Sequence, residues 1–423
     1  MPHSIEQVVH EQHGNTSGPS AGQRRRNADI LTETLPVRRQ EGNAGSSPLR
    51  GVKRTMWKKA VQNGTVLGLL VIATTARAQD AASEIARIEK QPRAGRVASY
   101  ETLANRKGFS EKDRLTVIAA FAGHARNLSP HYGRGTSPID VERWRAMLAW
   151  GHEQDPRNRD IAAALIQLLL DDGKTADAAP IAKTFLKESP DDHAAKAWDQ
   201  WCSRKGKGAP PPLRKFPLHF CVLTRNPEAA KRATREQCVK ETAIFNESFR
   251  TLARAPLVEF VFQGYSPYAE IRNSKSELVQ WGDRQKPYDS GQVLKAFNTC
   301  DDAKVRDRGA INVYIVDSYA PRAGFDDKTS HGVRNSNRPY LFIDWERLGS
   351  NIQNAEPHEM GHAFGLDHVG VIGAKGTTST NIMASAAEGF GSGGERDLGF
   401  TDSQAALILY HAERTADRLG LGR

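Results

Sequence analysis

The sequence predicts an all-α domain followed by an α+β domain with a mixed sheet. Three observations support this division. Residues 79–204 carry apolar side chains at helical spacing throughout. Residues 205–215, which read KGKGAPPPLRK, have the Gly, Pro and Lys content of a linker between domains. Residues 216–423 combine short aromatic and β-branched runs, typical of strands, with further helical patterns.

The excess of positive charge is concentrated at the N-terminal end. The formal net charge is +10, but residues 1–78 hold 11 Lys or Arg against five Asp or Glu. The remaining residues hold 48 basic and 44 acidic side chains, which is close to balance. A nucleic-acid-binding domain carries its basic residues on a folded face. We therefore predict no nucleic-acid partner.

Residues 1–55 are rich in Gly, Ser, Asn, Gln and Arg and show no apolar periodicity. Such a composition cannot bury enough apolar surface to fold, so we expect disorder. The next segment resembles a signal peptide, and a signal peptide begins where translation begins. We therefore expect Met56 to be the true start, with residues 1–55 not translated.

Residues 56–78 contain the three parts of a secretory signal peptide. Lys58 and Lys59 lie near the start, an apolar run covers 66–73, and a small-x-small cleavage site ends at Ala78. The run is shorter than the roughly 20 residues that span a bilayer, so we expect no stable membrane span. The prediction is export to the periplasm or the extracellular space. The alternative is an inner-membrane anchor formed by an uncleaved signal.

Within residues 79–204 the apolar spacing predicts helices from Asp140 through Trp150, from Pro156 to Gly173, and from Ala176 to Glu188. Pro156 and Pro190 are 34 residues apart, which is the period of the tetratricopeptide repeat.

Leu165, Gly173 and Ala178 fall where that repeat places a large residue, its turn glycine and a small residue. The region therefore resembles one tetratricopeptide repeat with flanking helices. Two interpretations remain open. One is a module that docks a protein partner or substrate, and the other is a helical pro-region or spacer packed on the domain that follows.

The second domain shows a strand, a helix and then further strands before its most informative segment. We predict strands over 216–223, 258–262, 311–316 and 339–343, a helix over 235–252, and a last helix that starts with a capping box at Thr401.

Residues 358–368 read H-E-x-x-H-x-x-G-x-x-H. His358 and His362 are four residues apart, so a helix places them on one face. Catalytic zinc takes three protein ligands and a water. Gly365 can adopt the left-handed conformation that ends a helix, after which the chain can bring His368 back to the same ion.

This pattern resembles the long motif of the metzincin zinc peptidases, and most closely that of the matrixins. The family also carries a methionine in a tight turn beneath the metal. Met383, in residues 381–384 (NIMA), is the matching residue. The resemblance covers roughly the last half of the chain. It implies a metzincin-like domain with one catalytic Zn²⁺, held by the three histidines of the active-site helix and the turn after it.

The resemblance implies an exported zinc-dependent endopeptidase acting on proteins or peptides. Glu359 would serve as general base toward the attacking water and then as general acid toward the leaving amine. Some metzincins place a tyrosine two residues after the methionine, but this chain has Ser385 there. The alternative function is an exported helical-repeat adaptor or scaffold with a structural, non-catalytic zinc site.

Four cysteines follow the signal peptide: Cys202, Cys221, Cys238 and Cys300. In an exported protein an even number predicts two disulfides, and four cysteines allow three pairings. A switch in which Cys202 caps the zinc is disfavoured, because its neighbours do not resemble the matrixin switch motif.

Two pairs of acidic residues, 301–302 and 326–327, could hold a structural Ca²⁺. Solvated loop carboxylates are the more common outcome for such pairs, so calcium is the weaker of the two metal predictions.

Overall fold

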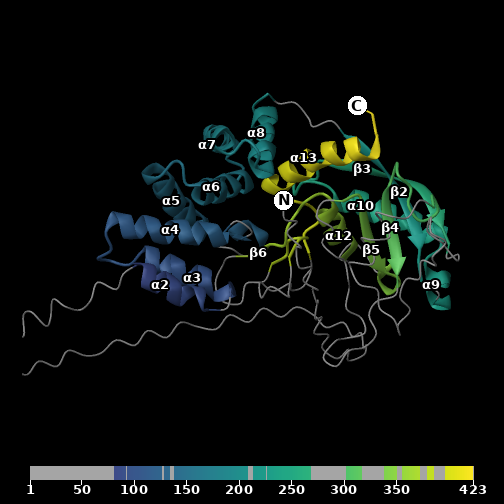
Figure 1. The fold of residues 1–423 in the computed structure, drawn as a ribbon, viewed down its shortest axis with the longest axis horizontal. Coiled ribbons are helices and arrows are strands. Elements are labelled where there is room, and N and C mark those ends of the chain that lie inside the picture. Colours follow the sequence, from purple (N-terminus) through teal and green to yellow (C-terminus); the bar gives the residue numbers. More distant parts are fainter. Residues whose placement is uncertain are drawn as a thin grey trace, which may run out of the picture. The chain divides into compact units, whose positions relative to one another are not determined.

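The computed structural model describes residues 81–91, 93–125, 128–133, 138–207, 213–224, 226–267, 302–316, 338–349, 355–371, 379–384 and 396–422 (Figure 1). Residues Ala81–Arg423 belong to one compact unit. The predictions for residues 1–55 and 56–78 lie outside the described residues. None of the described helices is both long and apolar enough to span a membrane.

The first part is helical, as predicted. Its helices are α2 (Ala81–Glu89), α3 (Arg93–Ala104), α4 (Glu111–Ala125), α5 (Pro138–Gln154), α6 (Arg159–Asp171), α7 (Thr175–Glu188) and α8 (His193–Gly206). Between α4 and α5 lie the two-residue strand β1 (Leu128–Ser129) and the 3₁₀ helix η1 (Pro130–Tyr132). The N-cap Asn158 accepts a hydrogen bond from the N–H of Ile161 (3.2 Å), and Gly173 follows α6 with φ +72°. The end at Gly173 agrees with the prediction, whereas the helix begins at Arg159, three residues after the predicted start, with Asn158 as its N-cap.

The second part contains a four-stranded sheet. Its strands are β2 (Arg214–Val222), β3 (Val258–Ser266), β4 (Ile311–Val316) and β5 (Tyr340–Asp344), in the order β3-β2-β4-β5. The four predicted strands are confirmed within a few residues. The remaining elements are α9 (Pro227–Arg232), α10 (Arg235–Ser248), the 3₁₀ helix η2 (Trp345–Arg347), α12 (Ala355–Ala363), the short strand β6 (Gly370–Val371) and α13 (Asp402–Leu419).

The prediction of a mixed sheet is wrong for the described strands, because all three strand pairs are parallel. Parallel neighbours need a crossover connection, and α9 and α10 form the one between β2 and β3. Every residue of β4 and β5 is buried, as expected for strands covered on both faces. The fold is therefore α+β, with a helical part and a parallel sheet.

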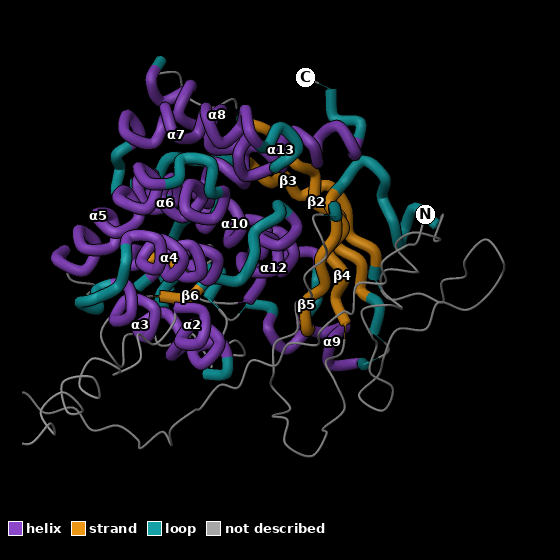
Figure 2. The backbone as a smooth tube through the Cα atoms, turned by 60° about the vertical axis from the view of Figure 1, so that its left-hand side comes forward, coloured by secondary structure: helices purple, strands orange, loops and turns teal. Residues whose placement is uncertain are grey.

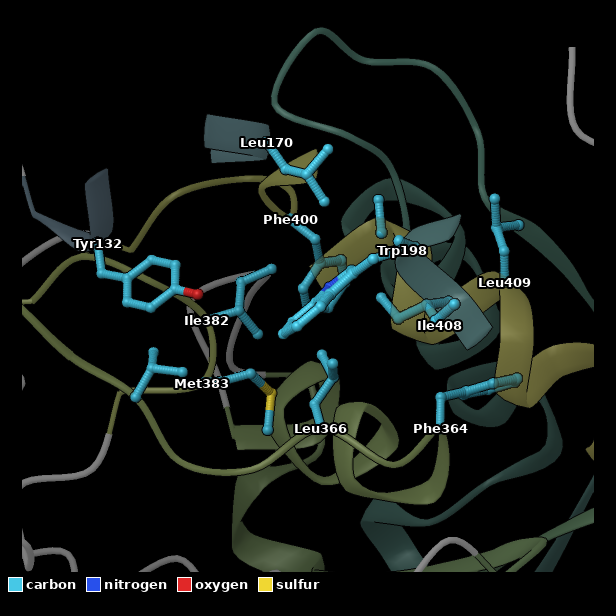
Figure 3. Packing of buried hydrophobic residues seen from close by; sticks show 14 of the residues in the cluster. Tyr132, Leu170, Trp198, Phe364, Leu366, Ile382, Met383, Phe400, Ile408 and Leu409 are labelled. Atoms are coloured by element: carbon cyan, nitrogen blue, oxygen red, sulfur yellow. The ribbon is translucent and has the colours of Figure 1, made fainter. Parts of the chain in front are cut away.

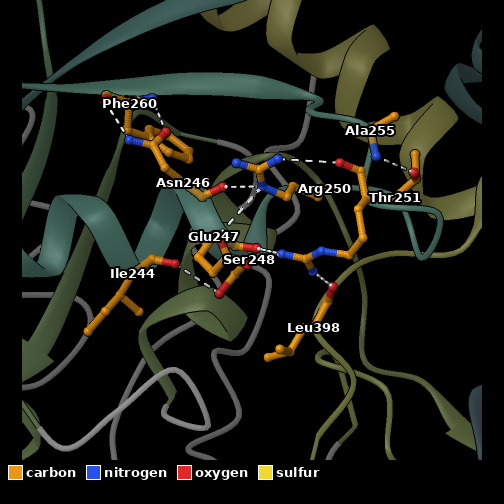
Figure 4. A network of polar contacts seen from close by, with 10 residues as sticks. Ile244, Asn246, Glu247, Ser248, Arg250, Thr251, Ala255, Phe260 and Leu398 are labelled. Atoms are coloured by element: carbon orange, nitrogen blue, oxygen red, sulfur yellow. Dashed lines mark hydrogen bonds and ion pairs between the residues drawn. The ribbon is translucent and has the colours of Figure 1, made fainter.

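Helices α10 and α12 position the functional segment against this sheet. Helix α10 contacts β3, and α12 contacts both β5 and α10 (Figure 2). Asn246 of α10 exchanges two hydrogen bonds with the backbone of Phe260 in β3, at 2.7 and 2.8 Å (Figure 4). Phe364, just after α12, packs edge-on against Phe216 with ring centroids 5.2 Å apart. The end of α12 is therefore anchored in the aromatic core under the sheet.

The C-terminal helix α13 joins the two parts. Its capping box is present as predicted. Its second residue, Ser403, contacts the helical part twice: its N–H donates to Oδ1 of Asp171 (3.0 Å), and its carbonyl accepts from Nε1 of Trp198 (3.3 Å). The predicted linker, residues 205–215, overlaps the end of α8 at Gly206 and the start of β2 at Arg214, and residues 208–212 lie outside the described residues. The chain on either side of this segment nevertheless packs into one unit.

The prediction of two disulfides is wrong. Cys202 and Cys238 are buried free thiols, so at most one disulfide could form among the four cysteines. Cys202 lies on α8 and Cys238 on α10, in separate halves of the core. Burial raises the pKa of Cys202 to about 11 and that of Cys238 to about 12, so both stay protonated and unreactive at neutral pH.

Cys300 and the acidic pair 326–327 lie outside the described residues, so the calcium site stays a prediction.

Asp171 should make the stability of the fold depend on pH. Burial raises its pKa from 3.8 to about 7. Between these values the folded state holds a proton that the unfolded state has lost, so the free energy of unfolding should fall as the pH rises from about 4 to about 7. Asp171→Asn keeps an acceptor for Ser403 and removes this titration. We expect the variant to gain up to about 4 kcal/mol over wild type at pH 8 and almost nothing at pH 4.

Denaturant unfolding at both pH values would measure this difference. Asp191→Asn, at an exposed position, is the matched control and should follow wild type at both. An Asp171→Asn variant with an unchanged pH profile would contradict the prediction.

Candidate metal centre

The three histidines of the motif meet at one point. His358 and His362 lie on α12, and His368 lies five residues beyond the end of that helix. Their Nε2 atoms form a triangle in which each side is 3.1 Å. All three rings are buried. Among the residues that the structure describes, this group is the set of His, Cys, Asp and Glu side chains arranged to share a metal ion.

Helix α12 ends at Ala363, and Gly365 adopts the left-handed conformation after it. Gly365 has φ +80°, its N–H donates to the carbonyl of His362 (3.0 Å), and the N–H of Leu366 donates to the carbonyl of Gly361 (3.0 Å). These two bonds form a Schellman motif, the helix ending that favours glycine at the left-handed position. The close packing of His411 also requires a glycine, because a Cβ at this position would lie 2.6 Å from its ring. The reversal of the chain returns His368 to the first two ligands.

Backbone carbonyls determine which ring nitrogen of His358 and of His362 is protonated. Nδ1 of His358 lies 2.9 Å from the carbonyl oxygen of Ile382, and Nδ1 of His362 lies 2.7 Å from that of Leu366. A carbonyl can only accept, so each Nδ1 carries the proton and each Nε2 presents a lone pair. The 3.1 Å approach of these two Nε2 atoms is therefore no hydrogen bond, and a cation between them would relieve the repulsion of their lone pairs.

The donor set fits zinc. Histidine nitrogens that share one tetrahedral ion at about 2.0–2.1 Å are about 3.3–3.4 Å apart, close to the separation seen here. Three imidazole nitrogens suit zinc, copper, iron or nickel better than the hard cations Mg²⁺ or Ca²⁺. Hydrogen bonds from the far ring nitrogens to carbonyls are the usual support of metal-binding histidines. Zinc itself stays a prediction.

Glu359 lies beside the histidines. It is 2% exposed, and its Oε1 is 4.0 Å from Nε2 of His358. The same helix that directs two histidines to the common point therefore places a carboxylate at its side, as the motif predicts. Arg396 lies close enough for charge interaction: burial lowers the pKa of its guanidinium, and the charge of Glu359 raises it.

Met383 lies directly beneath α12. It is fully buried, and its sulfur fills the space at Gly361, where a Cβ would come within 2.4 Å of Sδ. The N–H of Met383 donates to Oδ1 of Asn381 (2.8 Å), which shapes the turn. The carbonyl of Met383 accepts from the N–H of Val369 (2.9 Å), the residue after the third histidine. This Met turn, residues 381–384, therefore contacts both the helix and the third-ligand segment (Figure 3).

The sequence analysis assigned no supporting role to four residues that contact the centre: Gly361, Asn381, Gln404 and Arg396. Gly361 occupies one of the variable positions of the motif. The side-chain amide of Asn381 pairs with that of Gln404 through two hydrogen bonds of 3.0 and 3.1 Å. Nη1 of Arg396 donates to three Met-turn carbonyls, those of Asn381, Ile382 and Ala384 (3.2, 2.7 and 3.3 Å). Of these, only Asn381 could have been predicted from the sequence, because an asparagine in a turn often accepts a hydrogen bond from the backbone N–H two residues later.

Comparison of the chain with protein-family models, with curated proteins and with the solved structures found no match.

Gly361→Ala should disturb the metal centre. Alanine favours a helix by up to about 1 kcal/mol over glycine, so a neutral site would be stabilised. Here the new methyl group meets the sulfur of Met383, and we expect a net loss of about 1–3 kcal/mol together with weaker metal binding. Thermal unfolding and titration with zinc would measure both effects. Gly206→Ala at the end of α8, where a Cβ meets no atom within 4 Å, is the control. Equal behaviour of the two variants would contradict this packing argument.

Proposed function

We propose that the protein is an exported zinc-dependent endopeptidase of the metzincin type. The observation that carries the proposal is the triangle of three buried Nε2 atoms with a buried glutamate beside it. Within the described part of the chain, no fourth His, Cys, Asp or Glu joins the three histidines, which would leave one position of a tetrahedral ion open, the arrangement of catalytic zinc sites. Structural zinc sites are instead closed by four protein ligands.

The motif residues would then have separate roles in peptide hydrolysis. His358, His362 and His368 hold the ion, which when bound polarises the scissile carbonyl and lowers the pKa of water toward neutrality. A carboxylate oxygen of Glu359 takes a proton from the attacking water and later delivers it to the leaving amine. The low exposure of Glu359 keeps competing water away from this transfer.

The proposal extends to location and substrate. Residues 56–78 support export, because they have the charge, apolar run and cleavage site of a signal peptide. The substrates would be proteins or peptides. The helical part and the candidate centre lie in one compact unit, so the substrate would be cleaved beside the helical part.

Glu359→Gln should separate metal binding from catalysis. Glutamine keeps the size of the side chain but cannot accept the proton, and loss of a general base typically costs about 10²–10⁴-fold in rate. We expect the variant to retain one zinc per chain while kcat/KM for peptide cleavage falls by this factor. Metal analysis and a quenched-peptide assay would measure the two quantities on the same sample.

His362→Ala is the comparison variant and should lose both zinc and cleavage. A Glu359→Gln protein that cleaves at the wild-type rate would refute the assigned role. A wild-type protein that binds zinc but leaves a broad peptide library uncut would favour the adaptor function over the peptidase.

A further inference from the structure

The helical part reaches the Met turn through one backbone carbonyl. The carbonyl oxygen of Tyr132 in η1 accepts from Oγ of Ser379 (2.6 Å), from the N–H of Thr380 (3.0 Å) and from the N–H of Asn381 (3.3 Å). The hydroxyl of Tyr132 in turn accepts from Nε2 of Gln167 on α6 (3.2 Å). The start of the Met turn is therefore bound to a residue that the helices hold in place.

A second connection runs through α13. Asp171 and Trp198 of the helical part hold the backbone of Ser403, and the next residue, Gln404, forms the double amide pair with Asn381 of the Met turn. Ile382, which follows Asn381, provides the carbonyl that orients His358. Hydrogen bonds, linked through the adjacent residue pairs Ser403–Gln404 and Asn381–Ile382, thus lead from the helical part to His358.

A third connection between the helical part and the centre lies close to His368. Residues Leu128 and Ser129 of β1 pair in parallel with Gly370 and Val371 of β6, which begins two residues after His368.

The space between the two parts is filled with apolar side chains. Tyr132, Leu170 and Trp198 of the helical part lie in one packed cluster with Ile382, Met383, Leu366 and Ile408 (Figure 3). Each of these seven residues is at most 5% exposed. Removal of the helical part would expose this cluster to water and leave the donors that now bind Tyr132 without their acceptor, both of which cost free energy.

We propose that the helical part, residues 81–206, is a permanent component of the metal centre, which it supports by holding the Met turn and the first turn of α13. It stays bound in the working protein and is not removed as a pro-region. The inference rests on the proposed function, because that function makes the three histidines a zinc centre. The contacts assign Gln167 and Gln404 as positioning residues, which act on His358 through Tyr132, Asn381 and Ile382.

Cleavage of the chain between the two parts tests permanence. A site for a specific protease, inserted in the full chain between Gly206 and Arg214, would be cut under native conditions, followed by gel filtration and zinc analysis. We expect the two fragments to elute together and to keep the zinc affinity of the uncut protein. Fragments that separate would overturn the proposal. Co-elution needs no metal, so this result is independent of whether the proposed function holds.

Two substitutions test whether the helical part supports the metal centre. Gln404→Met removes the amide pair with Asn381, and Gln167→Met removes the donor to Tyr132, both at nearly constant volume. Loss of such outer contacts typically weakens metal binding about 10–100-fold, and we expect a loss in this range for Gln404→Met and a smaller one for Gln167→Met. Competition with a chelator would measure zinc affinity, and the absorption spectrum of the Co²⁺-loaded protein would report changes in ligand geometry.

The control is Gln200→Met, at an exposed position of α8, which should match wild type. If both test variants kept wild-type zinc affinity and an unchanged Co²⁺ spectrum, the helical part would merely pack beside the centre, and the proposal would fail. Circular dichroism would confirm that each variant is folded before its affinity is compared.

Discussion

The hydrogen bond from Nδ1 of His358 to the carbonyl of Ile382 is the constraint on which the candidate centre depends. A histidine is useful to a metal only if its ring is oriented and its far nitrogen carries the proton. This bond achieves both, but it joins residues 24 positions apart, so it exists only if the Met turn is correctly placed. The same carbonyl also accepts from Arg396, so a cationic donor holds it from another side.

The residues that follow α12 each have a separate structural role. Phe364 anchors the helix in the aromatic core, Gly365 reverses the chain, and the carbonyl of Leu366 orients His362. The turn therefore orients His362 and also leads the chain to His368. The hydrogen bonds of Gly365 and Leu366 join residues that are close in the sequence, so they can form together with the helix. The position of the Met turn, by contrast, depends on contacts with α13 and with η1 that form only when distant segments meet.

Several buried polar groups around the centre are hydrogen-bonded to one another. The amides of Asn381 and Gln404 exchange two hydrogen bonds, and three donors share the carbonyl of Tyr132. A buried network of this kind stabilises one arrangement, because any displacement leaves a polar atom without a partner. Asp171 is the member whose burial is costly, since its pKa is raised to about 7 while it binds the first turn of α13.

By itself, the sequence determined the local features: the helices of the first part, four strands, the cap at Thr401, the histidine spacing and the chain reversal at Gly365. These depend on periodicity and on end signals, which neighbouring residues carry. Only the tertiary structure decided the parallel direction of the strands, the free state of Cys202 and Cys238, the contact of Met383 with Gly361, and the attachment of the helical part to the Met turn. Each of these depends on a partner far away in the chain, and residue spacing carries no information about which distant segment a strand, thiol or carbonyl will meet.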